Sequence, residues 1–163
     1  MTANRTVPRR TFLSAASVGG LAVAGGLVLS GCSDSADNAR KAKIEQLRPL
    51  LNDARADEAS ARALIAGRPD RAAALTVVAG ERKAHADALV AEMTAIDASR
   101  GKDASTAAPS APVGAGSLDS LRQQLTASAK RAGDVAVAVE GYRAGLCGSI
   151  SAAVTTEVQV QLA

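Results

Sequence analysis

Apolar residues recur at steps of three and four in four segments of the chain, and this spacing constrains the fold more than any other feature. Such positions gather on one face of an α-helix, which is then buried against its neighbours. The spacing predicts an all-α protein, a four-helix bundle with helices over about 39–66, 70–99, 117–140 and 143–162. The four expected buried stripes are Ile44, Leu47, Leu51, Ala54, Glu58, Ala61 and Ile65; Leu75, Val78, Arg82, His85, Leu89, Glu92 and Ile96, with Met93 at the edge; Leu118, Leu121, Leu125, Ser128, Ala132, Val135 and Val139; and Leu146, Ile150, Val154, Val158 and Leu162.

The segments between the stripes predict how the helices are connected. Gly67-Arg68-Pro69-Asp70 ends the first helix and starts the second, with Asp70 as the expected N-cap. A connection this short makes those two helices antiparallel neighbours. Residues 100–116 are rich in Pro, Gly, Ser and Ala and predict a flexible linker, while Ser117 is the expected N-cap of the next helix. The linker is long enough to return along the bundle, so a crossover and an up-down-up-down order both remain open.

A β-hairpin is the competing interpretation of the C-terminal third. Val135, Val137 and Val139 alternate, as do Val158 and Val160, and alternation of branched residues is typical of strands. No turn dipeptide such as Asn-Gly joins the two runs, and helical stripes pass through both. Helices are therefore the favoured interpretation.

The first thirty-two residues resemble an export and anchoring signal. The pair Arg9-Arg10 followed by Phe12 and Leu13 resembles a twin-arginine motif, and an apolar run extends to Leu29. Glycine pairs inside that run make it a poor permanent membrane span, although its length comes close to one. Leu29-Ser30-Gly31-Cys32 resembles the lipobox of bacterial lipoproteins.

These two motifs divide the chain into a signal peptide (1–31), a lipidated tether (32–38) and the helical bundle (39–163). The resemblance implies a mature lipoprotein that begins at Cys32, whose sulfur carries acyl chains such as palmitate. Acyl chains contribute about 0.8 kcal/mol for each buried methylene, so two or three of them hold a protein firmly. The expected location is the outer face of the cytoplasmic membrane, in the cell envelope.

Charge and aromatic content exclude several functions for the part beyond Cys32. The formal charge of +3 comes from Arg5, Arg9 and Arg10, because the remaining sixteen basic residues are balanced by sixteen acidic ones. A neutral domain gives no electrostatic reason to bind nucleic acid or anionic lipid headgroups. Tyr142 is its one aromatic residue, too few for a base-stacking or sugar-stacking platform.

Two stretches carry a further resemblance, namely Glu81-Arg82-Lys83-Ala84-His85-Ala86-Asp87-Ala88-Leu89 and Gly141-Tyr142-Arg143-Ala144-Gly145-Leu146. They resemble a ferritin-like domain family of unknown function that occurs in actinobacterial lipoproteins and secreted proteins. The resemblance spans most of residues 40–163. It implies a four-helix bundle with a long crossover between the second and third helices, and it implies no particular chemistry.

The candidate polar site consists of Glu58, Glu81, Arg82, His85 and Glu157. Ferritin-like di-metal sites need two Glu-x-x-His pairs, and His85 is the only histidine in the chain. A complete site of that kind is therefore excluded. A reduced Fe, Mn or Zn site remains as an alternative, but the favoured interpretation is a buried polar cluster in which Glu58 pairs with Arg82, and His85 with Glu81 or Glu157.

The sequence indicates no catalytic residue and leaves the specific function open. Cys147 has no partner for an intramolecular disulfide once Cys32 is acylated, and it is expected to be a small buried residue or a thiol that pairs two copies. No phosphate loop, nucleophile elbow or CxxC motif is present. The favoured function is a non-catalytic binding or structural module at the membrane, with an unidentified protein partner. The alternatives are a degenerate ferritin-like metal protein and a carrier of apolar ligands.

Overall fold

A computed structural model describes residues 31–107 and 116–163, and this part of the chain is helical, without a strand. The expectation of an all-α protein is confirmed, and the valines that suggested a hairpin lie in or beside helices. The elements are α1 (Gly31–Ile65), the 3₁₀ turn η1 (Pro69–Arg71), α2 (Ala72–Ile96), α3 (Ala98–Thr106), α4 (Leu118–Ala138), α5 (Tyr142–Thr156) and the π-helical turn η2 (Glu157–Gln161). The predicted export signal and most of the lipobox lie outside the described residues, while Gly31 and Cys32 begin α1.

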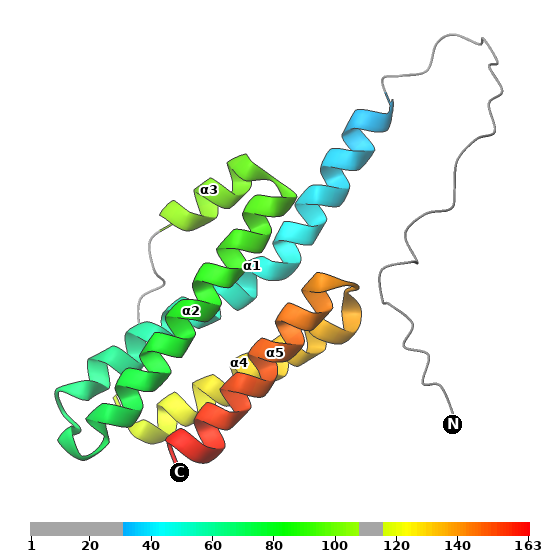
Figure 1. Ribbon diagram of the computed structural model, residues 1–163. Helices are drawn as coiled ribbons and strands as arrows, with labels where there is room; N and C mark the ends of the chain where they lie inside the picture. Colours follow the sequence, from blue (N-terminus) through cyan, green and yellow to red (C-terminus); the bar gives the residue numbers. More distant parts are fainter. Residues whose placement is uncertain (1–30, 108–115) are drawn as a thin grey trace, which may run out of the picture.

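The long helices pack side by side, α1 against α2 and α4, and α4 against α5 (Figure 1). Polar contacts between the helices show which residues lie opposite one another. Asp57 pairs with Arg82 between α1 and α2, Ser60 bonds Gln124 between α1 and α4, and Ser151 donates to the Ala129 carbonyl between α5 and α4. The short connection after Ile65 makes α2 antiparallel to α1. Helix α4 is antiparallel to α1 as well, because Asp53 pairs with Arg131 whereas the later Ser60 bonds the earlier Gln124, so α2 and α4 run in the same direction. The connection between them, which includes α3, is therefore a crossover.

The core is built from the aliphatic face of each long helix, as the stripes predicted. About two thirds of the expected positions are buried and the others are half-buried, including Glu58, His85 and Glu92 inside the stripes. The fully buried large residues include Ile44, Leu47, Leu51, Leu75, Val78, Leu89, Met93, Leu121, Leu125 and Leu162. All buried core residues lie between Ile44 and Leu162, so residues 44–162 contain the whole described core.

Helix α1 begins eight residues earlier than predicted. The expected tether is helical, and residues 34–43 are all exposed, so this part of α1 projects beyond the packed body (Figure 1). Asp34 lies in the first turn, where a negative charge stabilises the helix dipole, and Asp37 pairs with Arg40 at 2.7 Å one turn later. Local charge pairing supports a helix where composition suggested a flexible tether.

The predicted linker over 100–116 is wrong in its first part, because α3 occupies Ala98–Thr106. Asp97 ends α2 and caps α3, since its carboxylate accepts hydrogen bonds from the backbone of Ser99 (3.0 Å) and Arg100 (3.2 Å). Gly101 lets α3 approach α2 closely, because a Cβ there would overlap the backbone of Thr94. Arg55 of α1 donates to the carbonyl of Ala104 at 2.9 Å. These tertiary contacts hold a helix that the local composition disfavours.

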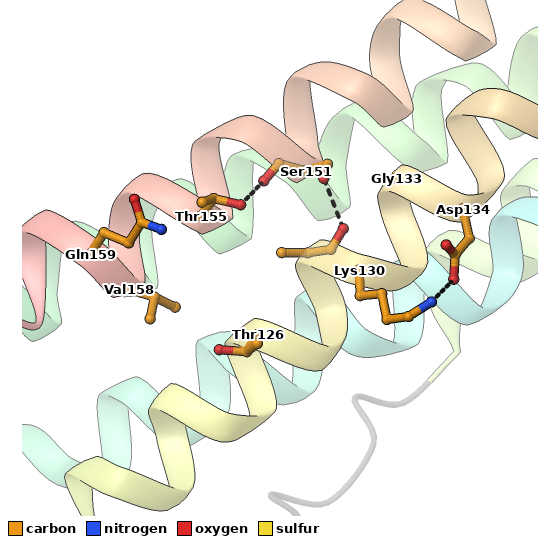
Figure 2. A pocket seen from close by; sticks show the side chains of 9 residues that line it. Thr126, Lys130, Gly133, Asp134, Ser151, Thr155, Val158 and Gln159 are labelled. Atoms are coloured by element: carbon orange, nitrogen blue, oxygen red, sulfur yellow. Dashed lines mark hydrogen bonds and ion pairs between the residues drawn. The ribbon is translucent and has the colours of Figure 1, made fainter.

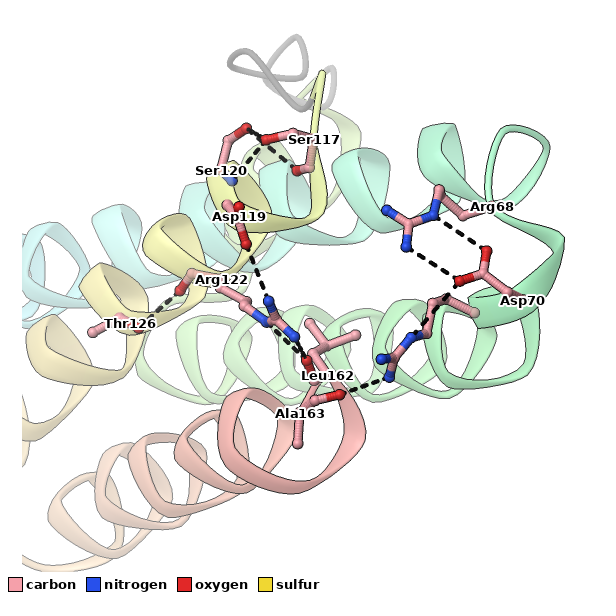
Figure 3. Close-up of polar contacts among 10 residues, drawn as sticks. Arg68, Asp70, Ser117, Asp119, Ser120, Arg122, Thr126, Leu162 and Ala163 are labelled. Carbon is pink, nitrogen blue, oxygen red and sulfur yellow. Dashed lines mark hydrogen bonds and ion pairs between the residues drawn. The ribbon is translucent and has the colours of Figure 1, made fainter.

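Of the two predicted N-caps, Ser117 is confirmed and Asp70 is wrong. Ser117 caps α4 by accepting a hydrogen bond from the Ser120 backbone at 3.1 Å, as expected. Asp70 is not the N-cap of α2, because it lies inside the 3₁₀ turn and pairs with Arg68 at 3.2 Å (Figure 3). The same figure shows Arg122 donating to the Leu162 carbonyl at 2.7 Å. Polar contacts thus hold the last residues against α4 at this end of the bundle.

The turn between α4 and α5 depends on Gly141, whose φ of 65° is unfavourable for residues with a side chain. Gly141→Ala is expected to lower the free energy of unfolding by about 1–3 kcal/mol, measured by urea denaturation. Gly145 is the matched control, since it lies inside α5 with open space around a Cβ. Gly145→Ala is expected to stabilise by about 0.5–1 kcal/mol. Equal effects of the two substitutions would contradict this role of Gly141.

No helix in the two described ranges is both long enough and apolar enough to span a membrane.

Candidate functional site

Three ionisable side chains from different elements are buried in the core. Arg82 of α2 is 1% exposed, and Asp57 of α1 and Glu157 of η2 are 0% exposed. Asp57 Oδ2 lies 2.9 Å from an Arg82 guanidinium nitrogen. The other terminal nitrogen of Arg82 lies 3.1 Å from Nδ1 of the half-buried His85. We call these four residues the central cluster.

Helix periodicity explains why these residues point inward. Arg82 lies in the stripe that contains Leu75, Val78 and Leu89, and Glu157 lies one turn after Val154 and shortly before Leu162. Both positions were predicted from the sequence. The buried face of α1 carries Ala54, Asp57, Ala61 and Leu64 at steps of three, four and three. The sequence permits this set and the neighbouring set with Glu58 and Ile65 equally well.

The predicted pairing of Glu58 with Arg82 is therefore wrong by one residue. Glu58 is half-buried and pairs with Arg62 of its own helix at 3.0 Å, while Asp57 takes its place in the core. Glu81 is exposed, although its charge reaches Glu157. His85 contacts Arg82 rather than an acidic partner. Two of the expected acidic residues thus lie outside the central cluster.

Burial controls the ionisation of the central cluster. It raises the pKa of Glu157 to about 8, an effect that the Arg82 charge opposes and the Glu81 and Asp57 charges strengthen. Burial also raises the pKa of Asp57, against the opposing charge of Arg82. Burial and the Arg82 charge together lower the pKa of His85 to about 4. At neutral pH the cluster therefore contains an Asp57–Arg82 ion pair, a protonated Glu157 and a neutral His85.

Hydrogen bonding in the central cluster is incomplete. Neither side-chain oxygen of Glu157 makes a well-directed hydrogen bond within the described residues, although Glu81 lies close enough to raise its pKa. The oxygens of Asp57 make no well-directed hydrogen bond either, although Ser128 and Gln124 lie close enough to lower its pKa. Buried polar groups without partners cost stability. The ion pair with Arg82 is thus the main stabilising contact of this cluster.

This arrangement does not provide a metal site in the described residues. The guanidinium of Arg82 contacts both Asp57 and His85, so a cation already occupies the centre of the cluster. Across the ranges 31–107 and 116–163, no three His, Cys, Asp or Glu residues are placed to hold a metal ion. The ligand set suggested by the sequence, Glu58, Glu81, His85 and Glu157, is not brought together.

Cys147 is a free and fully buried thiol on α5, one of the two arrangements left open by the sequence. Burial raises the pKa of its thiol, which keeps it protonated at neutral pH. A protonated, enclosed thiol is neither a nucleophile nor accessible for a disulfide between two copies.

Sequence reasoning missed a cleft between α4 and α5 (Figure 2). It has a volume of about 280 Å³, and its walls carry hydroxyl groups and the Lys130–Asp134 ion pair, whose charged atoms lie 2.6 Å apart. Gly133 deepens it, because a Cβ there would lie 3.2 Å from Ser151 Oγ. The lining residues are Thr126, Ala129, Lys130, Gly133, Asp134, Ser151, Thr155, Val158 and Gln159. The walls of this cleft therefore combine apolar atoms with hydroxyl groups and one ion pair.

Comparisons with known proteins do not assign the chain to a family. A scan against protein-family models finds no match, and searches of curated proteins and of solved structures find none either. The function therefore has to be inferred from the residues and their geometry.

Proposed function

We propose that this chain is a lipoprotein of the cell envelope, a ferritin-like four-helix bundle that acts as a non-catalytic binding or structural module. The order of α1, α2, α4 and α5, with a crossover after α2, supports the ferritin-like assignment. The lipobox that ends at Cys32 supports anchoring to the outer face of the cytoplasmic membrane. An unidentified protein partner is part of this proposal.

One observation carries the choice of a non-catalytic role. Arg82 fills the centre of the core, at a place where a ferritin-like metal protein needs ligands. Its charge is satisfied by Asp57, and His85 accepts a hydrogen bond from it instead of binding a metal. The central cluster is accordingly structural, and binding takes place on the surface of the bundle.

Anchoring is tested by the intact mass of protein extracted from membranes of a bacterium that processes lipoproteins. The expected product begins at Cys32 and carries a diacylglyceryl group and an acyl chain. Cys32→Ser is expected to abolish the modification, whereas Cys147→Ser, which changes the other cysteine, is expected to retain it. A mass that includes residues 1–31 without fatty acid would contradict the proposal.

The metal alternative is tested by elemental analysis of the same membrane-extracted protein. We expect Fe, Mn and Zn well below one ion per chain, with no difference between the native protein and His85→Ala. One bound ion per chain that is lost in His85→Ala would favour the degenerate metal protein instead. No observation on the described residues favours the apolar-ligand carrier, because the walls of the α4–α5 cleft mix polar and apolar atoms.

A further inference from the structure

Residues 157–163 join the two helical pairs of the bundle, and we call them the closing segment. Helices α1 and α2 form one pair, and α4 and α5 form the other. Arg71, just before α2, donates to the backbone oxygen of Ala163 at 2.7 Å. Arg122 of α4 donates to the Leu162 carbonyl at 2.7 Å (Figure 3). The closing segment is therefore bonded to the first pair on one side and to the second pair on the other.

Few side chains hold the closing segment in the core. Only Glu157 and Leu162 of this segment are buried, both 0% exposed, whereas Val160 is 66% exposed. Its backbone departs from the α-helix of α5, because Glu157–Gln161 form a π-helical turn that ends with a bond from the Leu162 amide to the Glu157 carbonyl at 3.0 Å. Such turns are rare and often lie at functional sites. A segment with so few core contacts is expected to open at a lower free energy than the long helices.

The groups around Glu157 leave it without a cation of its own among the described residues. The charges that act on it come from Arg82 and Glu81 of α2 and from Asp57 of α1. Arg82 is already paired with Asp57 at 2.9 Å, and its other terminal nitrogen lies beside His85. A buried carboxylate is unfavourable unless it is paired, so ionisation of Glu157 opposes the closed arrangement.

The remaining elements packed against the closing segment do not supply that cation either. Arg71 and Arg122 bond the backbone of the segment, and Lys130 of α4 pairs with Asp134 at 2.6 Å across the cleft from Val158. Helix α5 has no charged side chain between its second residue and Glu157.

We propose that the closing segment is a proton-controlled contact between the two helical pairs, closed while the Glu157 carboxyl group is protonated and open when it is ionised. Opening moves this carboxylate into water together with Leu162, and it breaks the bonds that Arg71 and Arg122 make to the segment. The open form is a minor population of the folded protein that increases as the pH rises. This device goes beyond the proposed binding module and does not depend on acylation of Cys32.

The proton on Glu157 determines how opening depends on pH. In the closed form burial raises the pKa of Glu157 to about 8, whereas in the open form the carboxyl group is in water and ionises near 4.5. The closed form therefore binds one more proton between these values, and the open population increases about tenfold for each pH unit. Above about pH 8 both forms are ionised and the increase ends.

Amide hydrogen exchange followed by NMR measures this opening residue by residue. Protection is expressed relative to the exchange rate of an unfolded peptide at the same pH. The amides of η2 and of Leu162 are expected to lose protection on the order of tenfold between pH 6.5 and about 8. They are also expected to be less protected than core amides such as those of Leu51 and Leu89.

Urea separates local opening from unfolding of the whole protein, because unfolding also frees Glu157 and gives core amides the same pH dependence. Local opening exposes little surface, so low concentrations of urea are expected to change the protection of the closing segment very little. The amides of Leu51 and Leu89 are expected to lose protection steeply with urea.

Three substitutions test the role of Glu157. Glu157→Gln is expected to remove the pH dependence in the closing segment, and Glu140→Gln, at an exposed position in the α4–α5 turn, is expected to retain it. Arg122→Gln is expected to lower the protection at least about tenfold at every pH, since it removes a bond to the segment but not the titrating group.

Two results would overturn the proposal. The first is a closing segment with the same protection and the same urea dependence as the core amides, which would show that it opens only when the whole protein unfolds. The second is protection that does not change with pH in the native protein, or that changes equally in Glu157→Gln. Neither result bears on the anchor proposed at Cys32.

Discussion

Arg82→Met is expected to lower the free energy of unfolding by about 3–5 kcal/mol, the largest effect of any single substitution considered for this chain. The methionine keeps most of the side-chain volume but leaves Asp57, fully buried, without its cation. Removing one partner of a buried ion pair costs this much because the remaining charge is neither solvated nor neutralised. Urea denaturation followed by circular dichroism at 222 nm measures the loss.

The neighbouring Lys83 provides the control for Arg82. It is exposed and pairs with Asp87 at 2.6 Å on the helix surface, so Lys83→Met is expected to change stability by less than about 0.5 kcal/mol. Replacing both members of the buried pair, Arg82→Met with Asp57→Leu, is expected to recover most of the loss, since no buried charge is left behind. A loss below about 1 kcal/mol in Arg82→Met would show that the pair does not hold the core.

Stability is expected to fall by about 2 kcal/mol as the pH rises from 6.5 to about 8, through the ionisation of Glu157. The folded state holds a proton on Glu157 up to about pH 8, whereas the unfolded chain releases it near 4.5. The folded state therefore binds one more proton between these values, and stability declines with pH at about 1.4 kcal/mol per unit. His85 acts in the opposite direction between about 4 and 6.5, so the decline is clearest above that range.

Glu157→Gln isolates this effect, because glutamine remains neutral at every pH. The variant is expected to lose the decline between pH 6.5 and about 8, so that the stabilities of the two proteins diverge as the pH rises. Glu140→Gln is the control, since Glu140 is exposed in the α4–α5 turn and its removal should leave the slope unchanged. Parallel pH profiles for the native protein and Glu157→Gln would contradict a protonated carboxyl group in the core.

The helices were predictable where periodicity alone determines burial. In α2 the expected positions Leu75, Val78 and Arg82 are buried. Further along the helix Ala86 and Met93 are buried, while the predicted positions His85 and Glu92 are only half-buried. In α1 the faces with Asp57 and Glu58 are equally apolar, so the sequence could not tell which acidic residue would reach Arg82. That choice is made by packing against α2 and α4.

Helix α3, which the sequence pattern did not predict, is held by contacts between residues that are distant in sequence. The segment that forms α3 contains glycine and small polar residues that favour turns. It is helical because Asp97 caps it and Gly101 packs against α2. In addition Arg55, which precedes Ala104 by 49 residues, donates a hydrogen bond to the Ala104 carbonyl. No local pattern indicates such a contact.

The position of the central cluster also has a kinetic consequence. Helices α1 and α2 are joined by a short turn, as are α4 and α5, so each pair can assemble from residues that are near in sequence. The two pairs meet where Glu157 from the second comes to lie beside Asp57 and Arg82 from the first. The cluster is therefore completed only when the preformed pairs dock. Asp57, Arg82 and His85 already meet within the first pair, so only the contacts of Glu157 form this late. A contact that forms only on docking acts mainly on the rate at which the folded protein opens, so substitutions of Glu157 are expected to change the unfolding rate more than the folding rate.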